Sequence, residues 1–302
     1  MTWFSPFESL TLRIDGEQVF LRHSPASDRQ KPALLLLHGF PQTHAMWHRV
    51  AQGLKQDFFL VMPDLRGYGA SSAPPAQPDQ SHMSKRAMAQ AMVSAMAQLG
   101  IERFALCGHD RGARVAHRMA LDHPAAVSQL CVMDIAPTLD MYAATDMAFA
   151  RAYYHWFHLI QPAPIPEQMI GGSPITYLHS KLGGWGTGGL AHLEKEALTA
   201  YEAAFTPTVI TQICDDYRAS AGIDLEHDRA SRERHVSAAK NLMGRVGRLV
   251  AEDTIQMHGG IGMTMEYALG HFAKRLSMVD HRFGDTDFHL ERFIRLSMDR
   301  AA

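Results

Sequence analysis

The sequence has 302 residues, of which 46% are hydrophobic and 20% are charged, and its formal net charge is −2. This length and composition predict one large α/β domain or two smaller ones around a substantial core. The near-neutral charge gives no reason to expect binding to nucleic acid or to an anionic membrane. No apolar run approaches the roughly 18 residues of a membrane helix.

Cysteine and histidine usage sets further limits. The three cysteines are too scattered for a disulfide framework, and the first residues, Met1-Thr-Trp-Phe-Ser-Pro6, lack the features of a signal peptide. We therefore expect a reduced, cytoplasmic protein. Although the chain has 18 histidines, none shows metal-ligand spacing, so no metal site is predicted.

The first 140 residues alternate between strand-like and helical segments. Two short alternating runs, 10–14 and 18–22, flank Asp15-Gly16 and predict a hairpin. Runs typical of buried strands follow at 33–38, 58–62, 104–107 and 127–133. Helical patterns lie between them at 45–55, 84–99 and 111–122. This alternation predicts an α/β fold with a doubly wound, mostly parallel sheet and chemistry at the carboxyl ends of its strands.

The pattern changes twice after residue 140. Residues 141–232 are aromatic-rich and mostly helical, with a Pro-rich turn at 162–166, and predict a helical cap over the sheet. Residues 233–302 predict further helices, and no buried-strand run appears after residue 140. We therefore expect three parts: a core at 1–140, a cap at 141–232 and a helical segment at 233–302.

Asp110 is the most informative residue of the chain. It stands between Gly108 and Gly112, after an apolar run and before a helical pattern, where a G-x-S-x-G turn places its serine. A carboxylate at such a corner can attack a saturated carbon and form an ester. Asp110 therefore predicts a substrate with a leaving group on saturated carbon, although a helix N-cap is the structural alternative.

Three motifs in order carry a family resemblance: His38-Gly-Phe-Pro41, Asp64-Leu-Arg-Gly-Tyr-Gly69 and Gly108-His-Asp-Arg-Gly112. Together they resemble the α/β-hydrolase superfamily. The aspartate at the turn narrows the resemblance to the dehalogenase and epoxide-hydrolase branch. Over roughly residues 1–230 the chain is similar to the fluoroacetate and haloacetate dehalogenases.

This resemblance implies a site for a small halogenated carboxylate. Asp110 would displace the halide, and Arg111 and Arg114 would grip the carboxylate, which suits the guanidinium fork. Haloalkane dehalogenases and epoxide hydrolases usually carry Trp at the position of Arg111. A solvated helix residue is the alternative for Arg114.

The resemblance also implies a halide pocket and a hydrolytic apparatus. His155, Trp156 and Tyr217 would donate hydrogen bonds to the departing halide, although an aromatic face of a cap helix is the plainer alternative. The backbone N–H groups of Phe40 and Arg111 would form the oxyanion hole. Asp134, which follows a predicted strand, would orient a general-base histidine.

The C-terminal segment departs from this pattern. Residues of about 235–296 resemble the C-terminal helical region of acyl-CoA dehydrogenases, through Gln256-Met-His-Gly-Gly-Ile-Gly262 and Gly270-His-Phe-Ala-Lys-Arg275. The rest of a flavin enzyme is missing, so no cofactor is predicted. The segment replaces the late strands and the loop that would carry the base. His271 is the candidate base, and the other candidates are His258, His281 and His289.

The sequence thus predicts an enzyme that hydrolyses a small 2-haloacid through an ester on Asp110, with ester hydrolysis impaired by the replaced segment. The predicted partner is a small-molecule substrate, and a homodimer is left open. An epoxide hydrolase or another hydrolase with an aspartate nucleophile is one alternative. A non-catalytic fusion, with late helices that expose apolar faces, is another.

Overall fold

A computed structural model describes residues 3–184, 189–229 and 285–298, together with isolated positions between 237 and 252. The chain divides into two compact units, Met1–Glu226 and His227–Ala302. The predicted core at 1–140 lies in the first unit, and so does the predicted cap at 141–232 as far as Glu226. His258, His271 and His281 lie outside the described residues.

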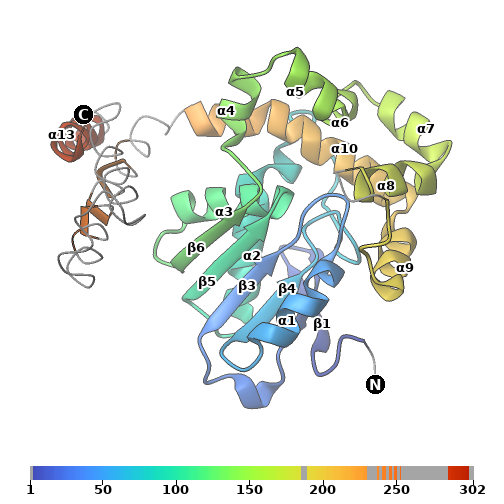
Figure 1. Cartoon of the computed structure of the whole chain (residues 1–302), viewed down its shortest axis with the longest axis horizontal. Helices are drawn as coiled ribbons and strands as arrows, with labels where there is room; N and C mark the ends of the chain where they lie inside the picture. Colours follow the sequence, from blue (N-terminus) through green and yellow to red (C-terminus); the bar gives the residue numbers. More distant parts are fainter. Residues whose placement is uncertain are drawn as a thin grey trace, which may run out of the picture. The chain divides into compact units, whose positions relative to one another are not determined.

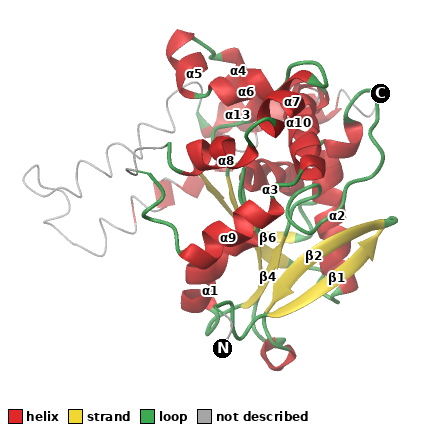
Figure 2. Ribbon diagram, turned by 90° about the vertical axis from the view of Figure 1, so that its right-hand side faces the viewer, coloured by secondary structure: helices red, strands yellow, loops and turns green. Residues whose placement is uncertain are grey.

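A six-stranded sheet forms the centre of the first unit, in the order β1-β2-β4-β3-β5-β6. The pairs β1–β2 and β2–β4 are antiparallel, whereas β3 pairs in parallel with β4 and β5, and β5 with β6. The predicted α/β fold with a mostly parallel sheet is confirmed, and Figure 2 shows the hairpin at one edge. The strands are β1 (Glu8–Ile14), β2 (Glu17–His23), β3 (Ala33–Leu37), β4 (Phe59–Pro63), β5 (Phe104–His109) and β6 (Val127–Met133).

Helices cover both faces of this sheet and the carboxyl ends of its strands. Those that follow the strands are α1 (His48–Leu54), α2 (Lys85–Gln98) and α3 (Arg111–Asp122), with short 3₁₀ turns at Ala26–Asp28, His44–Trp47 and Ser81–Met83. The cap comprises α4 (Thr138–Ala143), α5 (Met147–Ala152), α6 (Tyr154–Leu159), α7 (Ile165–Gly171), α8 (Pro174–Leu182), α9 (Lys195–Ala204) and α10 (Pro207–Ala221). These cap helices lie above the carboxyl ends of the strands (Figure 1).

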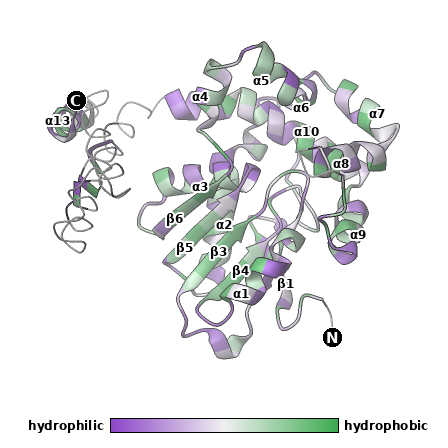
Figure 3. Ribbon diagram, viewed as in Figure 1, coloured by the Kyte–Doolittle hydropathy of each residue, from purple (hydrophilic) through white to green (hydrophobic). Residues whose placement is uncertain are grey.

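The apolar run of β3 explains why this strand lies at the centre of the core. Leu35 and Leu37 pack on one face with α2 and α3, while Leu34 and Leu36 pack on the other with α1 and the first residues of the chain. Because successive side chains of a strand point to opposite faces, a strand buried on both faces needs such an uninterrupted run. Figure 3 shows the resulting hydrophobic colouring of the central strands.

The cap contains two helices that the sequence did not predict. The Pro-rich stretch was interpreted as a turn, but α7 begins at Ile165 and includes Pro166, and α8 begins at Pro174. Proline is tolerated in the first turn of a helix, where its missing N–H has no intrahelical partner. Proline in these places therefore marks helix starts.

The last strand of the sheet is exposed. Within the described residues no strand follows β6, and the side chains of Leu130 and Val132 are each 43% exposed. β6 contains neither charge nor proline, so it lacks the usual devices that protect an edge strand.

The second unit is described mainly through α13 (Thr286–Met298). The amide of Asn241 donates to the backbone carbonyl of Thr286 over 2.9 Å. Among the described residues, no helix is long and apolar enough to cross a membrane. The described residues of both units also contain no group of three or more His, Cys, Asp or Glu side chains that could hold a metal ion.

Candidate active site

Asp110 occupies a strained corner between β5 and α3. Its backbone adopts φ 47° and ψ −115°, which residues other than glycine rarely adopt. The flanking glycines explain how the corner closes. A Cβ on Gly108 would lie 2.5 Å from the carbonyl oxygen of Gly112, and a Cβ on Gly112 would lie 2.3 Å from that of His38. Only glycine fits at both positions, and the turn holds the Asp110 carboxylate above the sheet.

One oxygen of Asp110 is already held by the backbone. The N–H of Phe40 donates to Oδ2 of Asp110 over 3.0 Å. This bond fixes the carboxylate and leaves Oδ1 as its second oxygen. The Phe40 N–H is thus placed to hold the carbonyl oxygen of an ester formed on this residue. The predicted contribution of the Arg111 N–H stays a prediction.

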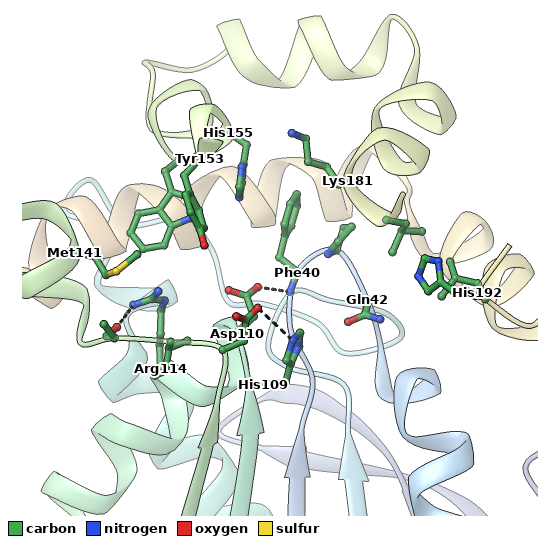
Figure 4. A pocket seen from close by; sticks show the side chains of 17 residues that line it. Phe40, Gln42, His109, Asp110, Arg114, Met141, Tyr153, His155, Lys181 and His192 are labelled. Atoms are coloured by element: carbon green, nitrogen blue, oxygen red, sulfur yellow. Dashed lines mark hydrogen bonds and ion pairs between the residues drawn. The ribbon is translucent and has the colours of Figure 1, made fainter. Parts of the chain in front are cut away.

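Asp110 opens into a cavity of about 830 Å³ between the strand ends and the cap. Figure 4 shows Asp110 and His109 below His155 and Lys181, which come from the cap. The remaining lining residues include Phe40, Gln42, Arg114, Asp134, Met141, Tyr153, Trp156 and His192. Catalytic sites are commonly placed in such cavities at the carboxyl ends of parallel strands.

Arg111 does not line this cavity, because Asp216 of α10 holds it. Its Nε donates to Oδ2 of Asp216 over 2.8 Å, and its Nη2 lies 2.7 Å from Oδ1. Nη2 also donates to the hydroxyl of Ser220. The third nitrogen, Nη1, is buried and has no hydrogen-bond partner among the described residues. Arg111 therefore keeps one buried donor that no described residue accepts from.

Asp216 is the centre of a buried charge network. It also pairs with Lys85, and Lys85 lies 3.7 Å from Asp224. Burial alone would raise the pKa of Asp216, but Arg111 and Lys85 hold it well below its usual range. Arg111 and Lys85 thus lie among two carboxyl groups, those of Asp216 and Asp224, beneath the cavity. These opposite charges offset the desolvation cost of burying Arg111.

Arg114 lies closer to the cavity and is less completely paired. Its Nη1 donates to the carbonyl of Ala136 over 3.0 Å and to the hydroxyl of Thr138 over 2.9 Å. Its Nε is buried without a partner in the described structure, and its guanidinium lies 4.6 Å above the ring of Trp156. Burial lowers the pKa of Arg114, while the Asp110 carboxylate raises it. No carboxylate neutralises Arg114 by direct contact among the described residues.

The three residues predicted for the halide form one aromatic cluster. His155 stacks on Phe40 with ring centroids 5.7 Å apart, and Tyr217 lies 5.9 Å from His155 and 6.4 Å from Trp156. His155 and Trp156 line the cavity, whereas Tyr217 is fully buried behind them.

Two members of this cluster have strongly shifted pKa values. Burial lowers the pKa of His155 to about 4, and the charge of Lys181 adds to the effect, so the imidazole is neutral at pH 7. Burial raises the pKa of Tyr217 well above its usual range, with a further contribution from Asp110. Its hydroxyl is buried without a hydrogen-bond partner in the part of the chain described. The cluster therefore presents neutral donors near Asp110.

Asp134 lies at the end of β6 and faces a histidine that the sequence analysis did not consider. Its Oδ2 is 3.8 Å from Nε2 of His109, and its side chain is 79% exposed. The candidate base His271 lies outside the described residues. His109 stands inside the recognised motif, directly before Asp110, and this position was the signal that could have identified it.

Lys181 and Asp216 were also missed. The ammonium of Lys181 lies 3.8 Å above the ring of Tyr154, and the residue is 9% exposed in the cavity wall. A single charged residue in a cap helix carries no motif, so its position could not be read from the sequence. Asp216 stands next to Tyr217, but its pairing with Arg111 joins positions 105 residues apart.

Comparison with known proteins assigns the fold and shows that the two ends of the chain match different families. Residues 32–180 match the alpha/beta hydrolase fold family. A fluoroacetate dehalogenase from Burkholderia sp. is 50% identical over 206 residues, which is 68% of each chain. The chain belongs to the α/β-hydrolase family. A second match, to the acyl-CoA dehydrogenase C-terminal domain, covers residues 216–296.

Further relatives agree with this assignment. A soluble epoxide hydrolase from Corynebacterium sp. (strain C12) is 36% identical over 106 residues, 35% of each chain. Among solved structures, a candidate α/β hydrolase from Nostoc sp. PCC 7120 is 49% identical, with a TM-score of 0.72 over 75% of this chain and 77% of that one. The predicted resemblance to α/β hydrolases, with a C-terminal match to acyl-CoA dehydrogenases, is confirmed.

Proposed function

We propose that the protein hydrolyses the carbon–halogen bond of a small 2-haloacid through an ester on Asp110. The observation that carries this proposal is a surplus of buried donors around one carboxylate nucleophile. Nη1 of Arg111, Nε of Arg114 and the hydroxyl of Tyr217 each lack an acceptor among the described residues. Buried donors are costly to leave unpaired, so their presence favours an anionic substrate and an anionic leaving group.

In the first half-reaction, Oδ1 of Asp110 attacks the carbon that bears the halogen. The carbon–halogen bond breaks, and the halide departs with its electron pair toward the His155, Trp156 and Tyr217 cluster. The two guanidinium groups hold the substrate carboxylate, because charge-assisted hydrogen bonds from a planar fork suit that group. The resemblance to fluoroacetate dehalogenase supports this choice of substrate.

In the second half-reaction, water attacks Cγ of the ester and releases a 2-hydroxyacid. The Phe40 N–H stabilises the negative charge that develops on the carbonyl oxygen. The acid that should orient the base is poorly held, since Asp134 is mostly exposed and its contact with His109 is 3.8 Å long. We therefore expect ester hydrolysis to be slower than ester formation.

Epoxide hydrolysis is the second candidate, because the corner aspartate and an epoxide hydrolase relative fit it as well. Arg111 and Arg114 argue against it, since a neutral epoxide offers no anionic group to Nη1 of Arg111 or to Nε of Arg114, which lack acceptors among the described residues. Halide release from fluoroacetate and chloroacetate should be compared with diol formation from styrene oxide, with Asp110→Asn as the control. Halide release that disappears in the variant supports the proposal. Diol formation without halide release would replace it, and inactivity toward both classes would favour a non-catalytic fusion.

A further inference from the structure

Lys181 is a buried cation in the cap wall of the cavity. It belongs to the last turn of α8, lines the cavity and is only 9% exposed. Among the described residues no carboxylate pairs with its ammonium, and no acceptor takes a hydrogen bond from it. Because a buried charge is costly unless an opposite charge offsets it, Lys181 favours an anionic ligand in the cavity.

Two aromatic rings hold this ammonium in place. Nζ of Lys181 lies 3.8 Å from the centroid of the Tyr154 ring and 5.4 Å from that of the Tyr177 ring. An aromatic face attracts a cation but carries no net charge, so these contacts position Nζ without neutralising it. A charge that is held in place before a reaction needs no reorganisation when an anion forms beside it.

Lys181 lies across the cavity from Asp110. Figure 4 shows Asp110 at the carboxyl ends of the strands, and Lys181 in the cap on the same side as His155. The charge of Lys181 contributes, after burial, to the lowered pKa of His155, which agrees with the short separation of the two side chains in the figure. The ammonium therefore belongs with the aromatic cluster of the cap rather than with the carboxylate of Asp110.

Displacement at a saturated carbon moves negative charge across this cavity. The nucleophile attacks opposite the bond that breaks, so a halogen on the attacked carbon points away from Asp110 and toward the cap. As the carbon–halogen bond breaks, the negative charge of the Asp110 carboxylate passes to the halide. A cation in the cap stabilises this transition state more than the ground state, in which the charge still lies on Asp110.

We propose that Lys181 binds the departing halide and supplies the positive charge that its release requires. This proposal rests on the proposed function. Oδ1 of Asp110 forms the bond to carbon, and the halide leaves with the electron pair of the broken bond. The ammonium of Lys181 keeps its protons and donates a hydrogen bond to the halide. The aromatic cluster supplies neutral donors, and Lys181 adds the net charge that this cluster lacks.

The test compares the first turnover of fluoroacetate and of chloroacetate in Lys181→Met and in the wild type, at saturating substrate. Halide release by Asp110→Asn is subtracted as the blank. Fluoride concentrates its charge on a smaller atom than chloride, so its release depends more strongly on a neighbouring cation. We expect Lys181→Met to release fluoride roughly 100-fold more slowly than the wild type, with a clearly smaller loss for chloride.

Lys181→Arg and Lys195→Met are the matched controls. Arginine keeps the positive charge, so Lys181→Arg should recover most of the fluoride release. Lys195 is an exposed lysine at the start of α9 and is not among the residues that line the cavity, so its loss should change neither rate. Retained chloride release shows that Lys181→Met is folded, and Lys181→Gln is a second neutral variant that should show the same difference between the halides.

Equal slowing of fluoride and chloride release in both neutral variants would overturn the assignment, because Lys181 would then act on the structure or on the body of the substrate. Unchanged release of both halides would overturn it as well. Either result leaves the proposed function intact, since the wild type still releases halide. A wild-type protein that releases neither halide would overturn the proposed function, and this assignment with it.

Discussion

Arg111 and Asp216 form a bidentate pair beneath the active-site cavity, with Nε–Oδ2 at 2.8 Å and Nη2–Oδ1 at 2.7 Å. The pair joins the first turn of α3 to α10. It orients the guanidinium and leaves Nη1 as a donor without a partner among the described residues. If an anionic substrate binds Nη1 as proposed, substrate binding and the packing of α3 against α10 depend on the same pair.

Asp216→Asn should destabilise the protein strongly. The change removes the carboxylate that pairs with Arg111 and leaves Lys85 with Asp224 at 3.7 Å, and uncompensated buried charge costs about 3–5 kcal/mol. Asp215→Asn is the matched control, because Arg218 keeps its 2.7 Å contact with Glu167. Urea unfolding measures both variants. Adding Lys85→Met to Asp216→Asn should recover part of the loss, and equal midpoints for the wild type and Asp216→Asn would refute the account of this network.

Arg114→Gln should impair the use of haloacids selectively. No carboxylate forms an ion pair with its guanidinium among the described residues, so under the proposed function Arg114 provides positive charge for the substrate. Loss of one charge-assisted contact predicts a KM for chloroacetate raised roughly tenfold or more. Arg118→Gln on the same helix is the control, since Arg118 pairs with Asp122 over 2.5 Å. An unchanged KM in Arg114→Gln would show that Arg114 does not bind the carboxylate.

His38 should make the protein less stable at mildly acidic pH. Its Nε2 accepts the Leu65 N–H over 2.9 Å, so the folded state holds the neutral ring, and burial lowers its pKa to about 4. Between pH 6.5 and 4, His38 is protonated in the unfolded chain but stays neutral in the folded chain. The free energy of unfolding therefore falls as the pH falls through this window, by up to about 3 kcal/mol. His155 acts in the same direction.

The measurement is urea unfolding at several pH values from 7 to 4. Glu17 and Asp224 act in the opposite sense, because burial raises the pKa of each. The control is therefore His38→Gln, which should flatten the profile whatever its stability at pH 7. A wild-type profile that does not fall on acidification would contradict the assignment of a neutral, buried His38.

Gly112→Ala should prevent the Asp110 turn from closing. The added Cβ would lie 2.3 Å from the His38 carbonyl oxygen and 2.5 Å from that of Leu37, both on the backbone. Gly53→Ala is the matched control in α1, where a Cβ meets no atom within 4 Å. We expect the control to be stabilised by up to about 1 kcal/mol through helix propensity. Thermal unfolding should show Gly112→Ala well below the wild type, and equal midpoints would contradict the close approach.

Much of the fold could be predicted because its signals are local. A few neighbouring residues are enough to predict each of three features: the hairpin at Asp15-Gly16, the buried strand β3 and the tight turn around Asp110. The helices α7 and α8 were missed because proline marks both turns and helix starts. The boundary between them depends on packing in the cap, which no short stretch of sequence records.

The candidate site was predictable only where a motif carried it. Asp110, Arg111 and Arg114 stand together in the sequence, so their proximity follows from one helix start. Other contacts form between elements that are distant in the sequence. Examples are the pairing of Arg111 with Asp216 and the contact between His109 and Asp134. The sequence analysis expected the guanidinium of Arg111 to bind the substrate. In the structure most of its donors instead bind Asp216 and Ser220.

The central claim is that Asp110 becomes covalently attached to the substrate. The most direct measurement is the mass of the peptide that contains Asp110 after brief reaction with fluoroacetate, which does not alkylate thiols at an appreciable rate, followed by an acid quench. The account predicts that this peptide gains one carboxymethyl group, that fluoride is released in equal amount, and that neither appears in Asp110→Asn. Fluoride release with an unmodified Asp110 peptide, or equal release from Asp110→Asn, would contradict it.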